Sequence, residues 1–489
     1  MNTSMLAGIL AYVLLLIGGV FFWLARRAAA AGPAEAEFEL AGRSLPVVVL
    51  IPTLALTILG SAHILGVFEM SWFLGGTAMW FGLACALAIA VVCLTTGRWM
   101  RRLRLATVPE LLEYLFGPGV RTAVCCVMAG VIFGLLTLET QGIGILLAAA
   151  TGWSIQEGVI VAGVLGVLYV ILAGMKEVGW INLVNAALMY IALIMATVFI
   201  AAALPEGFNT VSNHYLEAGE AHQLTIFGPM ALLLTFALSL VIAVNFSVPV
   251  NQFMLQVAMS ARSERDVVRA MWLAVPLNGL FCVFIVVLGM TAKTLPEFGE
   301  LGPKLAAPAM LAAMLPGWLA MLLLGSFVAA VLSTFAMTCL APATIFSMDL
   351  YRRLFRPDAT GAEITRVTRI AIVALAAAAT AIAGFLPPIL AALSWLLAWL
   401  IPILWLVFTG LFWRCSTAAA VATLTLAWTV NMLWTFTPLA GAMGIQQVPN
   451  VYVALVVTVA TGTLANLFVG TAKAGYFKSP EYAARVAAE

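Results

Sequence analysis

The feature that most constrains this chain is a series of long apolar runs, each long enough to cross a bilayer. A helix needs roughly 20 apolar residues to span the hydrocarbon core. Lipid cannot satisfy free backbone N–H and C=O groups, so such runs are predicted to be helices. The expected fold is therefore all-α and integral to the membrane, with about 13 transmembrane helices. The thirteen runs lie near 5–24, 46–68, 73–95, 121–149, 156–174, 179–203, 226–249, 271–292, 316–346, 367–386, 388–413, 416–436 and 450–471.

The composition supports a membrane environment and argues against several functions. Of the 489 residues, 64% are hydrophobic and 9% are charged, whereas a soluble domain carries about 25% charged residues. The net charge of +2 and the absence of a long basic run give no support to nucleic-acid binding. The sequence contains no H-E-x-x-H, G-x-S-x-G or P-loop motif, so we expect neither an enzyme nor an ATP-driven pump.

The distribution of Lys and Arg predicts the orientation of the chain. With the N-terminus outside, 21 of the 23 basic residues fall in inside loops, and only Lys293 and Lys304 fall outside. This asymmetry follows the positive-inside rule. We expect a multi-pass protein of the cell membrane, with an odd number of spans and a cytoplasmic C-terminus.

Two of the runs are interrupted by polar or helix-disrupting residues. Run 46–68 contains Pro52 and then Gly60-Ser61, and run 226–249 leads into a polar stretch around Pro249. Each is the first helix of a five-helix block. Broken helices at matching positions of two halves are typical of a transporter binding site. The pattern predicts a core of five plus five helices related as inverted repeats, with two broken helices.

The runs and loops divide the chain into six regions. A transmembrane helix and a cytoplasmic linker (1–45) precede the first repeat (46–204), and an extracellular loop (205–225) leads to the second repeat (226–414). Two further transmembrane helices (415–472) and a cytoplasmic tail (473–489) complete the chain.

Six short motifs connect the chain with a known family. They are LAGRSLP at 40–46, TVPELLEYLFG at 107–117, VGWINLVNAALM at 178–189, VNQFMLQVAMSA at 250–261, AAVLST at 329–334 with SMDLYRR at 347–353, and PILWLVFTGLFWR at 402–414. In this order and spacing, the chain resembles the sodium–solute symporter family. The resemblance implies a LeuT-type core and covers nearly the whole chain.

The resemblance also implies a sodium site between the first and eighth core helices. Its ligands would be the backbone carbonyls of Ala55, Ile58 and Ala330 and the hydroxyls of Ser333 and Thr334. Several neutral oxygens suit a hard cation that must later be released. Taken alone, such hydroxyls more often bond to carbonyls one turn back in their own helix, and it is the family resemblance that favours the ion site. Na⁺ is the expected coupling ion, and no organic cofactor is expected.

The chain departs from the family pattern at three positions. Amides stand at Asn182 and Asn251, where the family often has acids, and Val257 replaces an Arg that often follows Gln256. By the resemblance, the amide at position 182 affects the release of the ion toward the cytoplasm more than it affects the fold.

Polar side chains in the apolar runs are candidates for solute binding, because such groups are costly in lipid. Glu139 could hold a cationic part of a solute, couple to protons or pair structurally, and His63 could bind solute, titrate near neutral pH or be a buried structural residue. Glu69, Glu110 and Glu113 are expected to be wetted or solvated, and Asp349 to cap a helix. The candidate solute-binding set is His63, Glu139, Gln141, Asn245, Ser247 and Asn251.

These features favour sodium-coupled symport of a small polar organic solute into the cell by alternating access. An amino acid, a small carboxylate or a related metabolite would fit. One alternative is proton-coupled transport that uses Glu139 or His63. Another is a membrane protein that senses a solute without net transport. The partners expected in every case are a small solute and the lipid bilayer.

Overall fold

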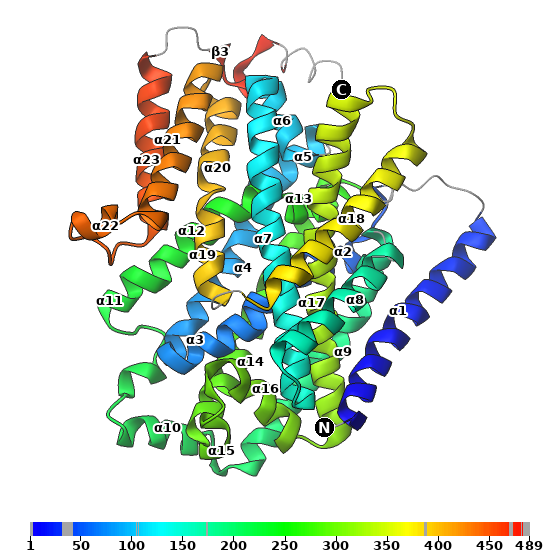
Figure 1. Ribbon diagram of the computed structural model, residues 1–489, viewed down its shortest axis with the longest axis vertical. Coiled ribbons are helices and arrows are strands. Elements are labelled where there is room, and N and C mark those ends of the chain that lie inside the picture. The colour runs from blue at the N-terminus through cyan, green and yellow to red at the C-terminus, as the bar shows by residue number, and fades with distance from the viewer. Residues whose placement is uncertain are drawn as a thin grey trace.

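Helices make up almost the whole molecule, as the computed structural model in Figure 1 shows. The structure describes residues 3–31, 43–103, 105, 107–172, 175–385, 389–468, 473–480 and 482. The linker segment 32–42 and the tail segment 483–489 lie outside the described residues. α1 begins at the end of the molecule that carries α10 and α15, and α23 ends at the opposite end, near β3 (Figure 1). A chain that crosses the membrane an odd number of times must begin and end on opposite sides.

The elements follow one another with short connections. The helices of the first half are α1 (Thr3–Ala31), α2 (Val47–Ile58), η2 (Ala62–Gly66), α3 (Val67–Leu74), η3 (Gly75–Ala78), α4 (Met79–Leu94), α5 (Thr96–Leu103), α6 (Val108–Phe116), α7 (Pro118–Thr151), α8 (Ile155–Leu172), α9 (Met175–Ala203), α10 (Phe208–Glu217) and η4 (Ala221–Leu224). Those of the second half are α11 (Met230–Leu232), η5 (Leu233–Leu238), α12 (Ser239–Ser247), η6 (Val248–Val250), α13 (Gln252–Met259), α14 (Glu264–Thr294), α15 (Pro296–Gly299), α16 (Gly302–Met314), α17 (Gly317–Thr344), η7 (Ile345–Phe355), α18 (Gly361–Ala383), α19 (Ile389–Ala398), α20 (Ile401–Phe408), η8 (Thr409–Trp413), α21 (Thr417–Phe436), α22 (Leu439–Ala442), α23 (Asn450–Phe468) and η9 (Tyr476–Lys478). The strands are β1 (Pro205–Gly207), β2 (Arg414–Cys415) and β3 (Lys473–Ala474), of which β2 and β3 pair antiparallel.

The predicted spans are present as helices, and the all-α membrane fold is confirmed. Each of the thirteen predicted runs overlaps helix within the described ranges. Eleven helical stretches there are long and apolar enough to cross a membrane, and two further apolar helices, Val47–Ile58 and Ile155–Val170, are shorter. The first of these is short because run 46–68 breaks after Ile58. The sequence did not predict the small β2–β3 pair, which brings the start of the tail onto the end of η8.

Corresponding helices of the two five-helix blocks pack on one another. α4 packs on α14, α7 on α17 and α8 on α18, which are the second, third and fourth helices of their blocks. α2 packs on α13 across the two interrupted helices. Pairing of like-numbered helices is the pattern that an inverted repeat produces.

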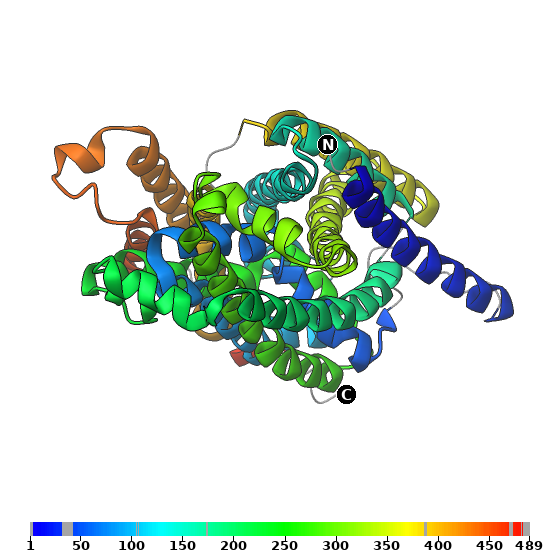
Figure 2. The same ribbon diagram turned by 90° about the horizontal axis from the view of Figure 1, so that it is seen from below.

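The ten-helix core is flanked on opposite sides by the remaining helices. Figure 2 shows α1, in dark blue, at one edge and α21 to α23, in orange and red, at the other. α17 is the most enclosed span: 89% of its apolar window is buried, against 28% for α1. A helix that is apolar all round and buried throughout belongs to the interior of the bundle, so α17 is where internal polar groups matter most.

A cluster of charges at the α5–α6 end of the molecule overturns part of the sequence interpretation. Arg121, at the start of α7, binds Glu113 of α6 and Asp349 of η7, and Arg353 also binds Glu113. Thr107 donates a hydrogen bond to Asp349 at 3.1 Å. The predictions of a solvated Glu113 and of a simple cap at Asp349 were wrong. Both carboxylates are largely buried, and each has a partner more than 200 residues away: Arg353 for Glu113 and Arg121 for Asp349.

We expect Arg121→Met to lower thermal stability markedly, because it leaves two carboxylates without their buried partner. Breaking a buried ion pair from one side costs about 3–5 kcal/mol. Arg353→Met is the matched control, since that side chain is 52% exposed and an exposed pair contributes about 0–1 kcal/mol. Thermal unfolding of the purified variants in one detergent measures both effects. Equal losses for the two variants would contradict the buried-cluster interpretation.

Candidate functional site

The first interrupted helix breaks at Leu59–Ser61, close to the Gly60-Ser61 pair that the sequence indicated. α2 ends at Ile58, Leu59 leaves the helical conformation (φ −87°, ψ 57°), and the chain resumes as the π-helical turn η2. Pro52, by contrast, lies inside α2 without ending it. The break frees the last carbonyls of α2 from their helical partners.

The second interrupted helix breaks at η6 and Asn251. α12 ends at Ser247, and Asn251 is extended (φ −76°, ψ 121°) before α13 begins at Gln252. The side chain of Asn251 is completely buried, and within the described ranges neither its oxygen nor its nitrogen has a hydrogen-bond partner. A buried amide of this kind carries unused hydrogen-bonding capacity.

The end of α2 meets the Ser333–Thr334 pair of α17. The Thr334 hydroxyl donates to the carbonyl of Leu56 at 3.0 Å, and its own-helix contact with Ala330 is longer, at 3.4 Å. The neighbouring Ser333 hydroxyl is completely buried and has no hydrogen-bond partner among the described residues. Most buried Ser and Thr hydroxyls bond one turn back, as Thr57 does to the carbonyl of Thr53 at 2.6 Å. Among the described residues, five buried Ser and Thr hydroxyls lack a partner, and Ser333 is the one that lies on α17; the others are Ser61, Thr77, Thr96 and Thr458.

A side chain from α14 also reaches the end of α2. The Asn278 amide donates to the carbonyl of Ala55 at 3.2 Å, and both residues are completely buried. The sequence interpretation did not select Asn278, although an amide in the middle of an apolar run was a usable signal. Its contact ties the seventh core helix to the first core helix at the break.

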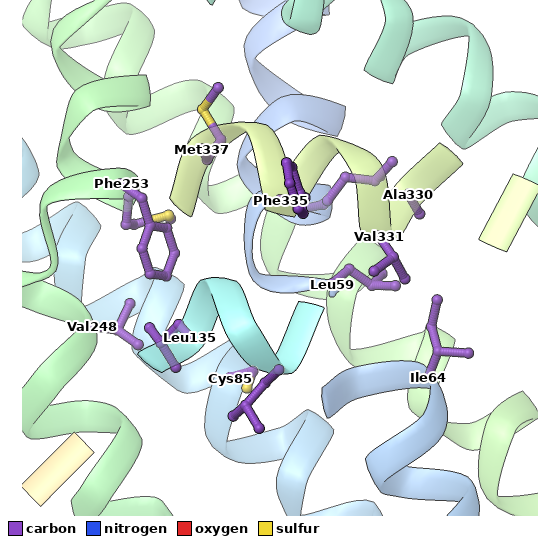
Figure 3. Packing of buried hydrophobic residues seen from close by; sticks show 14 of the residues in the cluster. Leu59, Ile64, Cys85, Leu135, Val248, Phe253, Ala330, Val331, Phe335 and Met337 are labelled. Atoms are coloured by element: carbon purple, nitrogen blue, oxygen red, sulfur yellow. The ribbon is translucent and has the colours of Figure 1, made fainter. Parts of the chain in front are cut away.

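Glu139 of α7 meets the other side of the same break. Its carboxylate accepts a hydrogen bond from the Ser61 N–H at 2.7 Å, and the residue is 6% exposed. Gly60 leaves room for this contact, because a Cβ at this position would displace the Glu139 carboxylate. One turn earlier on the same face of α7, Leu135 belongs to the buried cluster that contains Leu59, Val248 and Phe253 (Figure 3). This face of α7 therefore borders a cluster that draws on both interrupted helices.

The other predicted solute-binding residues do not all lie at one position in the structure. His63 packs against Phe81 and Phe281, with ring centroids 4.9 and 6.2 Å away. The Ile58 carbonyl lies near its ring, but neither ring nitrogen makes a hydrogen bond with good geometry. Gln141 is buried in α7, two residues after Glu139.

Asn245 and Ser247 have local partners. The Asn245 amide donates to the carbonyl of Ala84 on α4 at 3.2 Å and to its own helix at 2.9 Å. The Ser247 hydroxyl bonds to the carbonyl of Ala243 at 2.6 Å. Of the polar residues around the second break, Asn251 is thus the one whose side chain is left entirely unpartnered.

Two further buried polar residues stand out. Asn182 of α9 is completely buried, and both atoms of its amide lack partners. Glu69 of α3 is only 4% exposed, so the prediction of a wetted interface residue was wrong. It lies beside the backbone of Ile389, with Lys304 as a neighbouring charge. Enclosure by segments more than 200 residues away explains the error.

Two facing interrupted helices inside an inverted-repeat bundle define a membrane transporter of the LeuT type. Residues 38–426 match the sequence profile described as the Sodium:solute symporter family, and the chain belongs to this family.

Curated relatives and solved structures agree with that assignment. The chain is 25% identical to the "Uncharacterized symporter YidK" of Escherichia coli (strain K12) over 76% of its length and 66% of that protein. It is also 25% identical to "High-affinity choline transporter 1" of Drosophila melanogaster, over 78% of its length and 62% of that protein. The chain thus spans less than two thirds of either relative. These relatives are transporters, not enzymes.

The fold is shared with two solved transporters. A substrate-bound, outward-open Na⁺-coupled sialic acid symporter superposes with a TM-score of 0.78 at 16% identity, covering 96% of this chain and 98% of that one. A nucleobase-cation-symport-1 family transporter in a closed conformation gives 0.51 at 12% identity, covering 89% and 95%. At these identities the likeness concerns the fold.

We expect Gly142→Ala to lower thermal stability, because the new methyl would overlap the side chain of Ser61 and push α7 from the first break. Overpacking of this kind typically costs about 1–3 kcal/mol. Gly130→Ala on the same helix is the matched control, since nothing lies within 4 Å of a Cβ there. Thermal unfolding compares the two variants, and a loss as large for Gly130→Ala would refute the close approach.

Proposed function

We propose that the protein couples entry of a small polar organic solute to entry of Na⁺ by alternating access. The observation that carries the proposal is the Ser333 hydroxyl, which is completely buried, has no hydrogen-bond partner and lies next to Thr334 at the broken end of α2. A buried polar group without a partner costs free energy, and a bound cation would remove that cost.

The proposed ion ligands are the carbonyls of Ala55, Ile58 and Ala330 and the hydroxyls of Ser333 and Thr334. The hydrogen bonds that these groups make leave oxygen lone pairs free to bind an ion. The Ala55 carbonyl accepts one bond from Asn278 and keeps a second lone pair. Thr334 uses its proton on Leu56, which leaves its oxygen lone pairs for an ion.

An all-neutral oxygen site suits a coupling ion. It holds Na⁺ by dipoles without a full counter-charge, so release does not require separation of buried opposite charges. The site joins α2 to α17, which belong to different repeats, and occupancy would therefore bias how the repeats sit against each other. We place the inside of the cell at the α5–α6 end, where the Arg residues gather.

The proposed solute site lies between the two breaks. Glu139 and Asn251 are its leading candidate residues, and Gln141, Asn245, Ser247 and His63 are candidates with smaller roles. Support for transport comes from family membership and from relatives described as a symporter and a choline transporter. An amino acid, a small carboxylate or a related metabolite are the solutes that the polar residues of the sequence favour.

We expect sodium to raise the unfolding temperature of the purified protein relative to potassium at equal ionic strength. A ligand at 100 times its Kd adds about 2.7 kcal/mol of stability. Ser333→Ala should abolish this response, because it removes an ion ligand and leaves no other hydrogen bond unmade. Potassium is preferable to an organic cation as the reference, since an organic cation is itself a possible solute.

The matched control is Ser326→Ala on the same helix. Ser326 is also completely buried, but its hydroxyl bonds to the carbonyl of Leu323 at 2.7 Å. This variant should keep the sodium response. A wild-type protein that responds to pH and not to sodium would favour proton coupling through Glu139 or His63. Tight solute binding without accumulation in proteoliposomes would favour a sensor.

A further inference from the structure

Glu139 is a buried acid, and no ion pair found among the described residues gives it an opposite charge. Arg121, on the same helix, is 18 positions away, or about 27 Å along a helix that rises 1.5 Å per residue, and it is already paired. His63, on η2, is the titratable residue nearest in sequence to the Gly60–Ser61 break. Its ring packs against the rings of Phe81 and Phe281.

The contact with Ser61 does not by itself explain the acid. In the described ranges, Ser61 is the only residue that donates hydrogen bonds to Glu139. An ionised carboxylate has about four acceptor positions, and one backbone N–H could be satisfied by a Gln, a Ser or a water. A charged residue inside a membrane helix is expensive and is a functional feature by default. Gly142, where a Cβ would overlap the Cβ of Ser61, keeps α7 close to the break, and Gly60 leaves room for the Glu139 carboxyl group.

The position of the charge restricts the solute. Glu139 touches the break in the first core helix, where half-helix ends and freed backbone groups of a transporter meet the solute. When Glu139 is ionised, a solute carboxylate would meet like charge there in a medium of low dielectric. A positively charged nitrogen would instead complete a charge-assisted contact.

We propose that the transported solute carries a positively charged nitrogen, an ammonium or quaternary ammonium group, which binds the Glu139 carboxylate beside the Gly60–Ser61 break. This inference rests on the proposed transport function and narrows its solute to organic cations and zwitterions. Small carboxylates without a charged nitrogen are thereby excluded. Asn251 lies at the second break, and both of its amide atoms lack a partner among the described residues, so it is suited to hold a polar part of the same solute.

The test is thermal unfolding of the whole purified protein in sodium with small probes of different charge. The cationic probes are methylammonium, tetramethylammonium, guanidinium and choline, and the zwitterionic probe is glycine betaine. The anionic probes are acetate and lactate, and the neutral probe is glycerol. We expect at least one probe with a charged nitrogen to stabilise the wild type, and no anionic or neutral probe to do so. Stabilisation by an anionic or neutral probe, or by none of the probes, overturns the proposal.

Variants at position 139 identify the group responsible. Glu139→Gln keeps an acceptor for the Ser61 N–H and removes the charge, so it should fold and bind the stabilising probe about 30-fold more weakly or worse. Glu139→Asp keeps the charge and should retain part of the affinity. Glu69→Gln is the matched control, because it removes a second buried acid that already lies near Lys304. Undiminished affinity in Glu139→Gln overturns the assignment.

The sodium response separates this inference from the proposed function. If the wild type responds to sodium but to no charged nitrogen, the ion site stands and the solute assignment fails. If a cationic probe stabilises through Glu139 while sodium has no effect, sodium coupling fails and the solute assignment stands. Retention of the sodium response in Glu139→Gln also shows that this variant is folded.

Discussion

Backbone groups released inside a membrane have to find partners within the protein, and the centre of this structure is organised around that requirement. Lipid offers no hydrogen bonds, so a break in a helix at this depth is tolerated only where other segments supply them. Three side chains do so at the first break. Thr334 and Asn278 donate to carbonyls at the end of α2, and Glu139 accepts from the N–H of Ser61. They come from α17, α14 and α7, so one break fixes the relative positions of four helices.

The same requirement explains why small residues gather at the centre. Side chains can reach freed backbone groups only if the helices approach closely. Gly60, Gly142 and, between α7 and α8, Gly158 allow contacts in which a Cβ would overlap a neighbour. Close packing through small residues is also the main source of helix association in lipid, where burial of apolar side chains gives little. The packing that stabilises the bundle and the packing that shapes the site are therefore the same.

Much of this arrangement could be predicted from the sequence because it depends on local patterns. Run length located the spans, and the Gly60-Ser61 and Pro249 signals located both interrupted helices. Pro52 was also expected to interrupt its helix, but it lies inside α2, since a Pro can remain within a membrane helix. The errors at Glu113, Asp349 and Glu69 have a different cause. Whether a charge is solvated depends on its partners, and Arg121 lies 228 residues from Asp349. Asn278 was missed for the same reason, because its carbonyl partner is 223 residues away.

The separation between backbone and side-chain roles at the first break has an evolutionary consequence. The ion ligands proposed on α2 are carbonyls, which every residue type provides, whereas the charge proposed to face the solute belongs to a single side chain on α7. A substitution at position 139 can therefore reverse or remove the charge preference of the site without altering either the break or the hydroxyl pair on α17. Descendants of one ancestral transporter could thus acquire solutes of opposite charge by a few substitutions on one helix and inherit the energy source unchanged.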